Sequence, residues 1–169
     1  MNYSECIIKA KDRIGKFCKA CPECNGRACK NQMPGPGSKG IGDTAVRNYD
    51  KWKEIRVQMD TIAENKPVDT SLELFGKTFC YPVFAGPVGA VSLHYGDCLD
   101  DVAYNDILVS ACAENGIAAF TGDGVDSNVM VAATAAIKKA GGVGIPTVKP
   151  WNLETIREKM ELVHESGAF

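Results

Sequence analysis

The sequence has almost no net charge and no long hydrophobic run at its N-terminus, and each shortage excludes a class of partner. Its 21 acidic residues nearly balance 19 basic ones, so a net charge of −2 offers no basic field to nucleic acid or an anionic membrane. The first residues, "MNYSECIIKAKDRIGKFC", contain no apolar stretch of signal-peptide or membrane-span length. We therefore expect a cytoplasmic protein that binds neither nucleic acid nor membranes.

Cysteine, in contrast, is plentiful, and half of the eight cysteines lie close together. In a chain without an export signal, such residues are expected as thiols or metal ligands rather than as disulfides. The spacing C-x2-C-x2-C-x4-C lets four sulfurs converge on one zinc ion or iron–sulfur cluster, and a segment of reduced thiols without metal is the alternative. The four residues are Cys18, Cys21, Cys24 and Cys29.

The composition divides the chain into two segments. Residues 1–45 are rich in Cys, Lys, Gly and Pro, and their "NQMPGPGSKGIGD" stretch excludes a long helix or a central strand. We assign residues 1–45 to an N-terminal extension and residues 46–169 to a second domain. A short helix is expected over residues 44–59, with Val46, Tyr49 and Ile55 as its apolar contacts.

Short apolar runs alternate with helical patterns in the second segment. Strands are expected over residues 79–85 and in "IAAFTG" and "VGIPTV". Helices are expected in "DILVSACAENG", "SNVMVAATAAIKKAGG" and "NLETIREKMELVHESG". Such alternation is typical of an α/β protein with a parallel sheet and crossover helices.

Capping residues mark the ends of the expected helices. Gly116 should follow the first of them in a left-handed conformation, and Ser127 and Asn152 are expected as N-caps of the next two. The third helix should present one apolar face at helical spacing. That face would consist of Leu153, Ile156, Met160 and Val163.

The stretch "ELFGKTFCYPVFAGPVGAVSLHYGD", residues 73–97, is similar to a known enzyme family. It resembles the FMN-dependent α-hydroxy-acid oxidases and dehydrogenases, which include lactate and glycolate oxidases. The matching features are a glycine before the first barrel strand, a proline, the strand itself, a Gly-Pro turn and a Leu-His-Tyr-Gly-Asp run. They correspond to Gly76, Pro82, Val83 to Ala85, Gly86-Pro87 and Leu93 to Asp97.

This resemblance implies a (β/α)8 barrel, of which the chain would hold the N-terminal half. Three βα units fit the sequence, and Ala168-Phe169 would begin a fourth strand. The family's flavin-contacting lysine and its catalytic His-Gly-Gly-Arg motif have no counterpart, because neither His94 nor His164 stands in such a motif. The catalytic residues therefore remain unknown, and we expect the chain by itself to be inactive and to bind FMN weakly or not at all.

The family also implies a function and a set of site residues. The full-length enzyme, expected to be a homo-oligomer, would oxidise a small-molecule 2-hydroxy acid by transferring a hydride equivalent to FMN. The turn after the first strand would line the flavin and a hydroxyl ending the second strand would contact it, with a plain turn residue as the alternative for each. At the end of the third strand the sequence departs from the family's Gln-x-Tyr, and Thr147 and Lys149 are the nearest alignment. A lysine would bind the substrate, unless it is only a solvated surface side chain. These residues are Gly86, Pro87, Val88, Gly89, Thr121 and Thr147 for the cofactor, and Lys149 for the substrate.

Two alternatives stand beside this hypothesis. In the first, the cysteine cluster is the functional part of a non-catalytic metal-binding or redox module, with the βα units as scaffold. In the second, the chain belongs to another FMN barrel enzyme, similar to dihydroorotate dehydrogenase. An absorbance spectrum would separate flavin from iron–sulfur and zinc.

Overall fold

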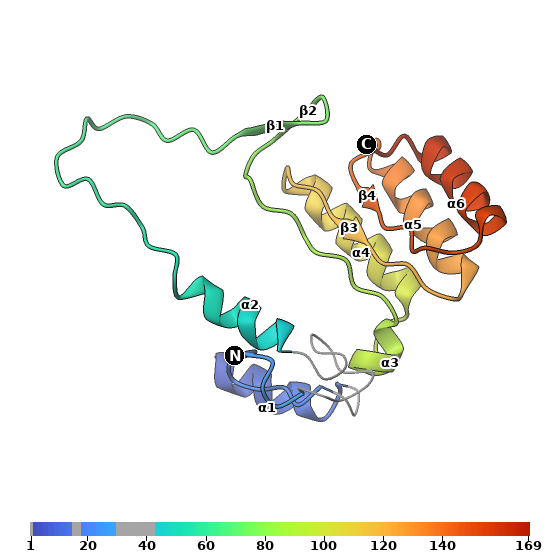
Figure 1. Ribbon diagram of the computed structural model, residues 1–169, viewed down its shortest axis with the longest axis horizontal. Helices are drawn as coiled ribbons and strands as arrows, with labels where there is room; N and C mark the ends of the chain where they lie inside the picture. The colour runs from blue at the N-terminus through green and yellow to red at the C-terminus, as the bar shows by residue number, and fades with distance from the viewer. Residues whose placement is uncertain (1, 15–17, 30–42) are drawn as a thin grey trace. The chain divides into compact units, whose positions relative to one another are not determined.

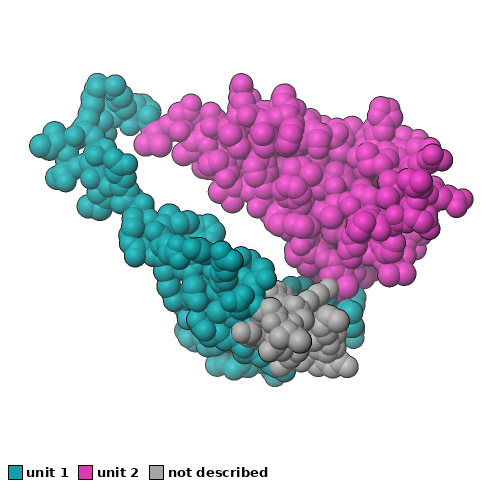
Figure 2. Space-filling view, viewed as in Figure 1, with its two compact units in different colours: residues 1–67, 92–98 teal, residues 68–91, 99–169 magenta. Residues whose placement is uncertain are grey.

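The computed structural model describes residues 2–14, 18–29 and 43–169 (Figure 1). The chain divides into two compact units, coloured separately in Figure 2. The first unit comprises Met1–Pro67 and Ser92–Cys98, and the second comprises Val68–Val91 and Leu99–Phe169. Within the described residues, no helix is long and apolar enough to cross a membrane. Most of the glycine- and proline-rich stretch at residues 31–43 lies outside the described residues.

The first unit contains helices α1 (Tyr3–Lys11) and α2 (Thr44–Trp52). A capping box begins α1, because the Asn2 side chain accepts a hydrogen bond from the Glu5 amide and the Glu5 carboxylate accepts one from the Asn2 amide. The helix expected over residues 44–59 is real but ends early. Val46 is buried, whereas Ile55 is 63% exposed. Residues 53–59 are all exposed in this structure, and packing, which supplies most helix stability, therefore does not extend the helix.

The second unit begins with a hairpin rather than with the expected strand over residues 79–85. Strands β1 (Leu72–Leu74) and β2 (Lys77–Phe79) pair antiparallel, with Leu72 opposite Phe79. Beyond Phe79 the chain runs beside residues 116–120. The Cys80 amide donates a hydrogen bond to the Gly116 carbonyl, and among residues 80–85 only Ala85 forms a β-bridge, which is parallel and pairs it with Ala119. Pro82 lies between these contacts and has no amide hydrogen to donate, which limits the regular strand.

The next two expected strands are present and parallel, although they are short. Strand β3 (Phe120–Thr121) pairs with β4 (Ile145–Pro146), with Phe120 opposite Ile145. Together with the Ala85 bridge, three chain segments thus lie side by side in sequence order. The protein is therefore a mixed α/β structure, and its described residues do not form a complete barrel.

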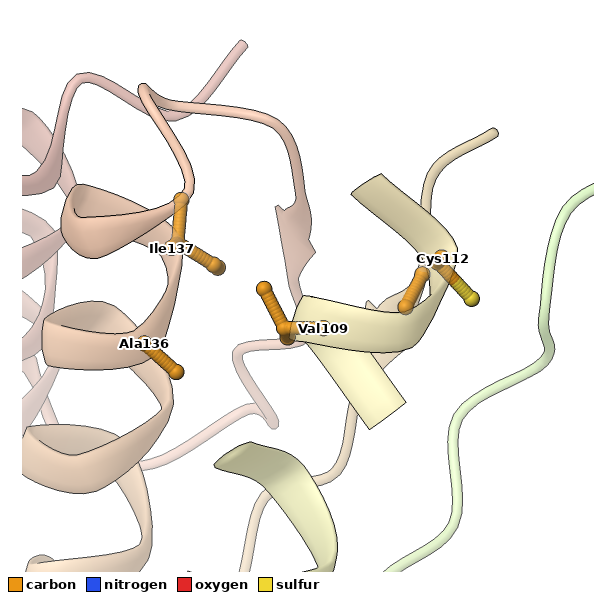
Figure 3. Close-up of a cluster of buried hydrophobic side chains, with 5 residues drawn as sticks. Val109, Cys112, Ala136 and Ile137 are labelled. Carbon is orange, nitrogen blue, oxygen red and sulfur yellow. The ribbon is translucent and has the colours of Figure 1, made fainter. Parts of the chain in front are cut away.

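Helices follow these strand segments and supply the core. The short α3 (Val91–Tyr95) precedes α4 (Asp101–Glu114), which packs on α5 (Ser127–Lys139), and α5 packs on α6 (Leu153–Ser166). At the first of these interfaces, buried side chains of α4 and α5 face one another (Figure 3). The cluster consists of Val109, Cys112, Ala119, Ala136 and Ile137.

The helix ends agree with the expected caps at two positions and differ at one. Gly116 has a φ of +68°, as predicted, and the Asn152 side chain accepts a hydrogen bond from the Thr155 amide at 2.9 Å. The prediction of Ser127 as an N-cap is wrong. Asp126 caps α5 instead, because its carboxylate accepts from the Asn128 amide at 2.9 Å.

The predicted apolar face of α6 is also wrong in part. Leu153 and Met160 are 72% and 50% exposed, whereas Lys159 and Ser166 are buried. The face of α6 that packs inward instead includes Lys159, which forms an ion pair with Asp123. After α6, Ala168 packs against the core, and the Phe169 ring lies 5.7 Å from that of Phe79 without forming a strand.

Candidate functional site

Three turns follow the carboxyl ends of the parallel strand segments, the end at which barrel proteins bind ligands. Residues 86–89 follow Ala85, residues 122–124 follow β3 and residues 147–151 follow β4. The first two turns are in close contact. A Cβ on Gly122 would lie 2.0 Å from the Val88 carbonyl oxygen, and one on Gly89 would lie 3.1 Å from the Asp123 carbonyl oxygen. Position 122 therefore accepts only glycine in this arrangement.

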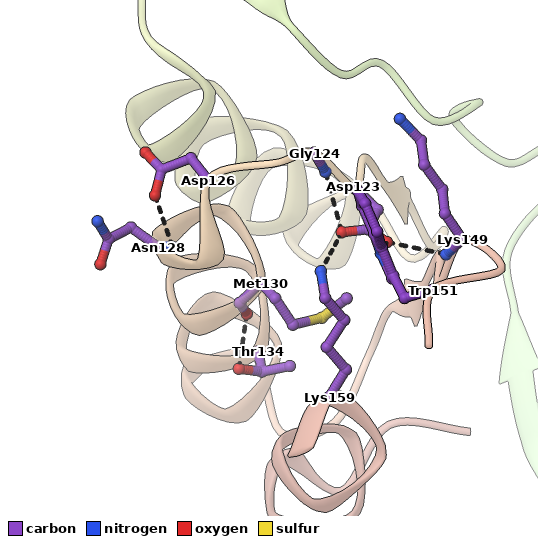
Figure 4. Close-up of polar contacts among 9 residues, drawn as sticks. All are labelled: Asp123, Gly124, Asp126, Asn128, Met130, Thr134, Lys149, Trp151 and Lys159. Atoms are coloured by element: carbon purple, nitrogen blue, oxygen red, sulfur yellow. Dashed lines mark hydrogen bonds and ion pairs between the residues drawn. The ribbon is translucent and has the colours of Figure 1, made fainter. Parts of the chain in front are cut away.

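Asp123 joins the second turn to the third and to α6 (Figure 4). Its Oδ2 accepts hydrogen bonds from the Lys149 amide at 2.8 Å and from the Trp151 Nε1 at 2.7 Å. Its Oδ1 accepts from the Gly124 amide at 2.9 Å and from the Lys159 ammonium. One carboxylate thus fixes the chain that follows β4 and orients α6.

This ion pair is buried, with Asp123 2% exposed and Lys159 6% exposed. Burial by itself raises the pKa of the Asp123 carboxyl. The hydrogen bonds from the Lys149 amide, Lys159 and Trp151, together with the charge of Lys159, outweigh it, so that the pKa lies below its ordinary value. Asp123 is therefore an ionised carboxylate at neutral pH, which explains why Lys159 points inward from α6.

Thr121 ends β3 with its side chain completely buried. Its hydroxyl Oγ1 has no hydrogen-bond partner among the described residues. A buried polar group without a partner costs about 1–3 kcal/mol, so such a group marks a place where a ligand can supply the missing bond. The hydroxyl that the sequence assigned to cofactor contact thus has an unused hydrogen-bonding capacity.

The structure brings most of the other expected site residues to this same edge. Gly86 and Pro87 are exposed, and no described atom lies within 4 Å of the position that a Cβ on Gly86 would take. Thr147 and Lys149 lie in the turn after β4, where the Lys149 side chain is exposed and extends away from Lys159 (Figure 4). This leaves open surface beside the glycine turn.

Neither histidine belongs to these turns. His94 is buried in α3 and is grouped with the first unit, whereas His164 is exposed near the end of α6. Sequence reasoning missed Asp123, Trp151 and Lys159. The run Thr-Gly-Asp-Gly after a buried strand was a signal for Asp123, but nothing local distinguishes Lys159 from a surface lysine.

The four clustered cysteines line one cavity of about 190 Å³ in the first unit, together with Tyr95. Burial raises the pKa of the Cys29 thiol, and the neighbouring Cys24, Cys18 and Cys21 raise that pKa further. In the part of the chain that the structure describes, no three His, Cys, Asp or Glu side chains are arranged to hold a metal ion. The predicted metal ligands thus share a cavity without surrounding one point.

Comparison with known proteins identifies the family. A family model described as FMN-dependent dehydrogenase matches residues 36–161, which is more than half of the chain and includes all three turns. The chain therefore belongs to the FMN-dependent dehydrogenase family, as the resemblance at residues 73–97 implied. It is accordingly an FMN-dependent oxidoreductase. No curated protein and no solved structure matched the chain.

Proposed function

We propose that this chain contributes the flavin-lining part of an FMN-dependent enzyme that oxidises a 2-hydroxy acid, that the chain is inactive by itself, and that residues 46–169 fold as part of a (β/α)8 barrel. The unpartnered buried hydroxyl of Thr121, which stands beside a glycine turn at the carboxyl end of parallel strands, is the observation that carries the proposal. A hydroxyl can donate to or accept from the edge of the flavin ring. The parallel pairing of three strand segments in chain order supports the barrel.

Each turn has a separate role in this proposal. Gly86 to Gly89 let the backbone approach a flat ring, since glycine carries no side chain to hold it away. Thr121 supplies one hydrogen bond, and Thr147 lines the same edge. Bound FMN would supply the oxidant, a two-electron acceptor for the hydride equivalent from the substrate Cα. Lys149 holds the substrate carboxylate by a charge-assisted hydrogen bond, and Asp123 positions Lys149 through its backbone amide.

Two substitutions test whether Thr121 and the turn at residues 86–89 line the flavin. Thr121→Val removes the hydroxyl but keeps the shape, so it should weaken FMN binding about 2- to 12-fold, the equivalent of one hydrogen bond of 0.5–1.5 kcal/mol. Gly86→Val should weaken FMN binding by at least about tenfold, because the branched side chain would occupy space needed by the ring. The dissociation constant is measured by titrating FMN and following its fluorescence.

The controls for this experiment separate flavin contact from folding. The Thr134 hydroxyl donates to the Met130 carbonyl inside α5, so Thr134→Val changes another buried threonine and should leave the FMN dissociation constant unchanged. Thermal unfolding should show that Thr121→Val and Gly86→Val keep wild-type stability, since the first loses an unsatisfied group and the second meets open space. Wild-type FMN affinity in both site variants would refute this wall of the flavin site.

The substrate class is tested through Lys149. With FMN bound, lactate should shift the flavin absorbance, whereas propionate, which has the carboxylate but not the hydroxyl, should have a smaller effect. Lys149→Met should weaken lactate binding by about tenfold or more, because a hydrogen bond to a charged group contributes about 1.5–3 kcal/mol. FMN affinity should not change, and Lys138→Met, at an exposed position of α5, is the control.

The alternative outcomes are distinct. Equal lactate affinity in the Lys149→Met variant and wild type would remove Lys149 from the substrate site. A flavin spectrum that responds to no 2-hydroxy acid would contradict the substrate class while leaving the FMN site intact.

A further inference from the structure

Four cysteine side chains line a cavity and lie before the segment that matches the FMN-dependent dehydrogenase model. The match begins at residue 36, whereas the described lining residues other than Tyr95 end at Cys29. Among the described residues, the volume of about 190 Å³ is bounded by sulfur, amide and aromatic groups and one lysine, without a carboxylate or imidazole. The cysteines that line it are Cys18, Cys21, Cys24 and Cys29.

Two tight turns bring these sulfurs to one side of the segment. Ala20 is buried with a φ of +44°, and its amide donates a hydrogen bond to the Cys18 sulfur at 3.5 Å. Gly26 has a φ of +74°, and a Cβ there would lie 2.8 Å from the Ala45 Cβ, so the second turn packs closely against α2. The Cys29 thiol donates to the Gly26 carbonyl at 3.8 Å. The Ala20 amide is the kind of donor that orients and tunes a metal-bound thiolate, whereas the Cys29 thiol would give up its bond to the carbonyl together with its proton when the sulfur binds metal.

The first unit also has little hydrophobic core to hold these turns. Among its described residues, Ala20 and Val46 are the only buried hydrophobic ones, and α1 buries none of its residues. Small units that bury so little apolar surface are commonly stabilised by a structural metal, disulfides or association. No disulfide links the cysteines of the described part.

We propose that this cavity binds a metal centre through the four thiolates, either a zinc ion or an iron–sulfur cluster. An all-sulfur donor set selects these soft centres and is unsuited to magnesium or calcium. Each thiol gives up its proton as its sulfur binds, so four protons leave when four metal–sulfur bonds form. Because the four sulfurs do not surround one point in this structure, the thiols would have to rotate inward to bind the metal. Lys19 lines the same cavity, and its positive charge would offset part of the negative charge of a tetrathiolate centre.

The test uses the full chain purified without oxygen or chelator and analysed for zinc, iron and sulfide. We expect about one zinc, or about four iron with equal sulfide, per chain. Protein stripped of metal is then supplied with zinc alone, or with sulfide and equal amounts of ferrous and ferric iron, which together have the oxidation level of a four-iron cluster. The two centres are distinguished by stoichiometry and by visible absorbance. A chain that holds neither metal in either experiment would overturn the proposal.

Cysteine alkylation read by mass spectrometry locates the site without relying on variants. Bound metal should protect the four cavity cysteines, whereas the exposed Cys80 and Cys98 should react equally with and without metal. Cys21→Ser and Cys24→Ser should each lose most of the bound metal, whereas Cys6→Ser, in α1 of the same unit, should retain it. Unprotected cavity cysteines in the loaded chain, or wild-type metal content in Cys21→Ser, would refute the assignment.

Discussion

Replacing Asp123 by asparagine should lower the free energy of unfolding by about 3–5 kcal/mol, because it leaves the buried ammonium of Lys159 without its counter-charge. The amide also has a single acceptor oxygen for the amide of Lys149, the indole of Trp151 and the other donors that the carboxylate now satisfies. The measurement is urea unfolding at neutral pH. Loss of the second unit's helical signal should accompany the transition.

Three variants show whether this effect belongs to the ion pair. Asp126→Asn makes the same chemical change at the N-cap of α5, where asparagine caps as well as aspartate, and should stay close to wild type. Lys159→Met should lower the free energy of unfolding by less than Asp123→Asn does, because the Asp123 carboxylate keeps its N–H donors. The double variant should lose less unfolding free energy than the sum of the losses in the two single variants. A cost below about 1 kcal/mol for Asp123→Asn would contradict the buried pair.

Acid should remove the contribution that the Asp123 carboxylate makes to the free energy of unfolding. The pKa of Asp123 is lower in the folded chain than in the unfolded chain, so its stabilisation is complete above the unfolded value of about 3.9. It is lost as the pH falls through the folded pKa. The difference in unfolding free energy between wild type and Asp123→Asn should therefore shrink when unfolding is repeated below about pH 4. A difference independent of pH would contradict this assignment.

Gly122→Ala is expected to have the second large effect, on stability and on FMN binding together. Its Cβ would lie 2.0 Å from the Val88 carbonyl oxygen and 2.9 Å from the Gly89 Cα, and these backbone atoms cannot move as a side chain would. The turn at residues 86–89 must shift outward, at a cost of about 1–3 kcal/mol or more. Since the turn at residues 86–89 is proposed to line the flavin, FMN affinity should fall by at least about tenfold.

Gly124→Ala provides the matched control two residues away. A Cβ there would meet the nearest side-chain carbon, of Val129, at 3.9 Å, an ordinary contact. This variant should keep wild-type stability and FMN affinity. If Gly122→Ala destabilised the chain but bound FMN as tightly as wild type, the packing of the two turns would stand and their flavin role would not.

Local sequence determined the class of structure and the family. Alternating apolar runs and amphipathic segments predicted β3, β4 and the helices that follow them, and the cap at Asn152 was readable because capping depends on neighbouring backbone groups. The stretch at residues 73–97 was specific enough to indicate the FMN-dependent family. These features are encoded within a few residues, so a single sequence contains them.

Other features depended on contacts between distant segments. Lys159 lies 36 positions from Asp123 and reads as a surface residue until the two turns and α6 come together. The expected first strand is reduced to a single bridge at Ala85. Strand pairing depends on which backbone amides reach the distant carbonyls of Gly116 and Ala118, and local sequence does not specify these contacts. Ile55, Leu153 and Met160 were apolar at helical spacing yet exposed, since periodicity says which side chains share a face but not what covers it. Tertiary packing alone decided the buried ion pair, the orphaned hydroxyl of Thr121 and the contact that makes Gly122 irreplaceable.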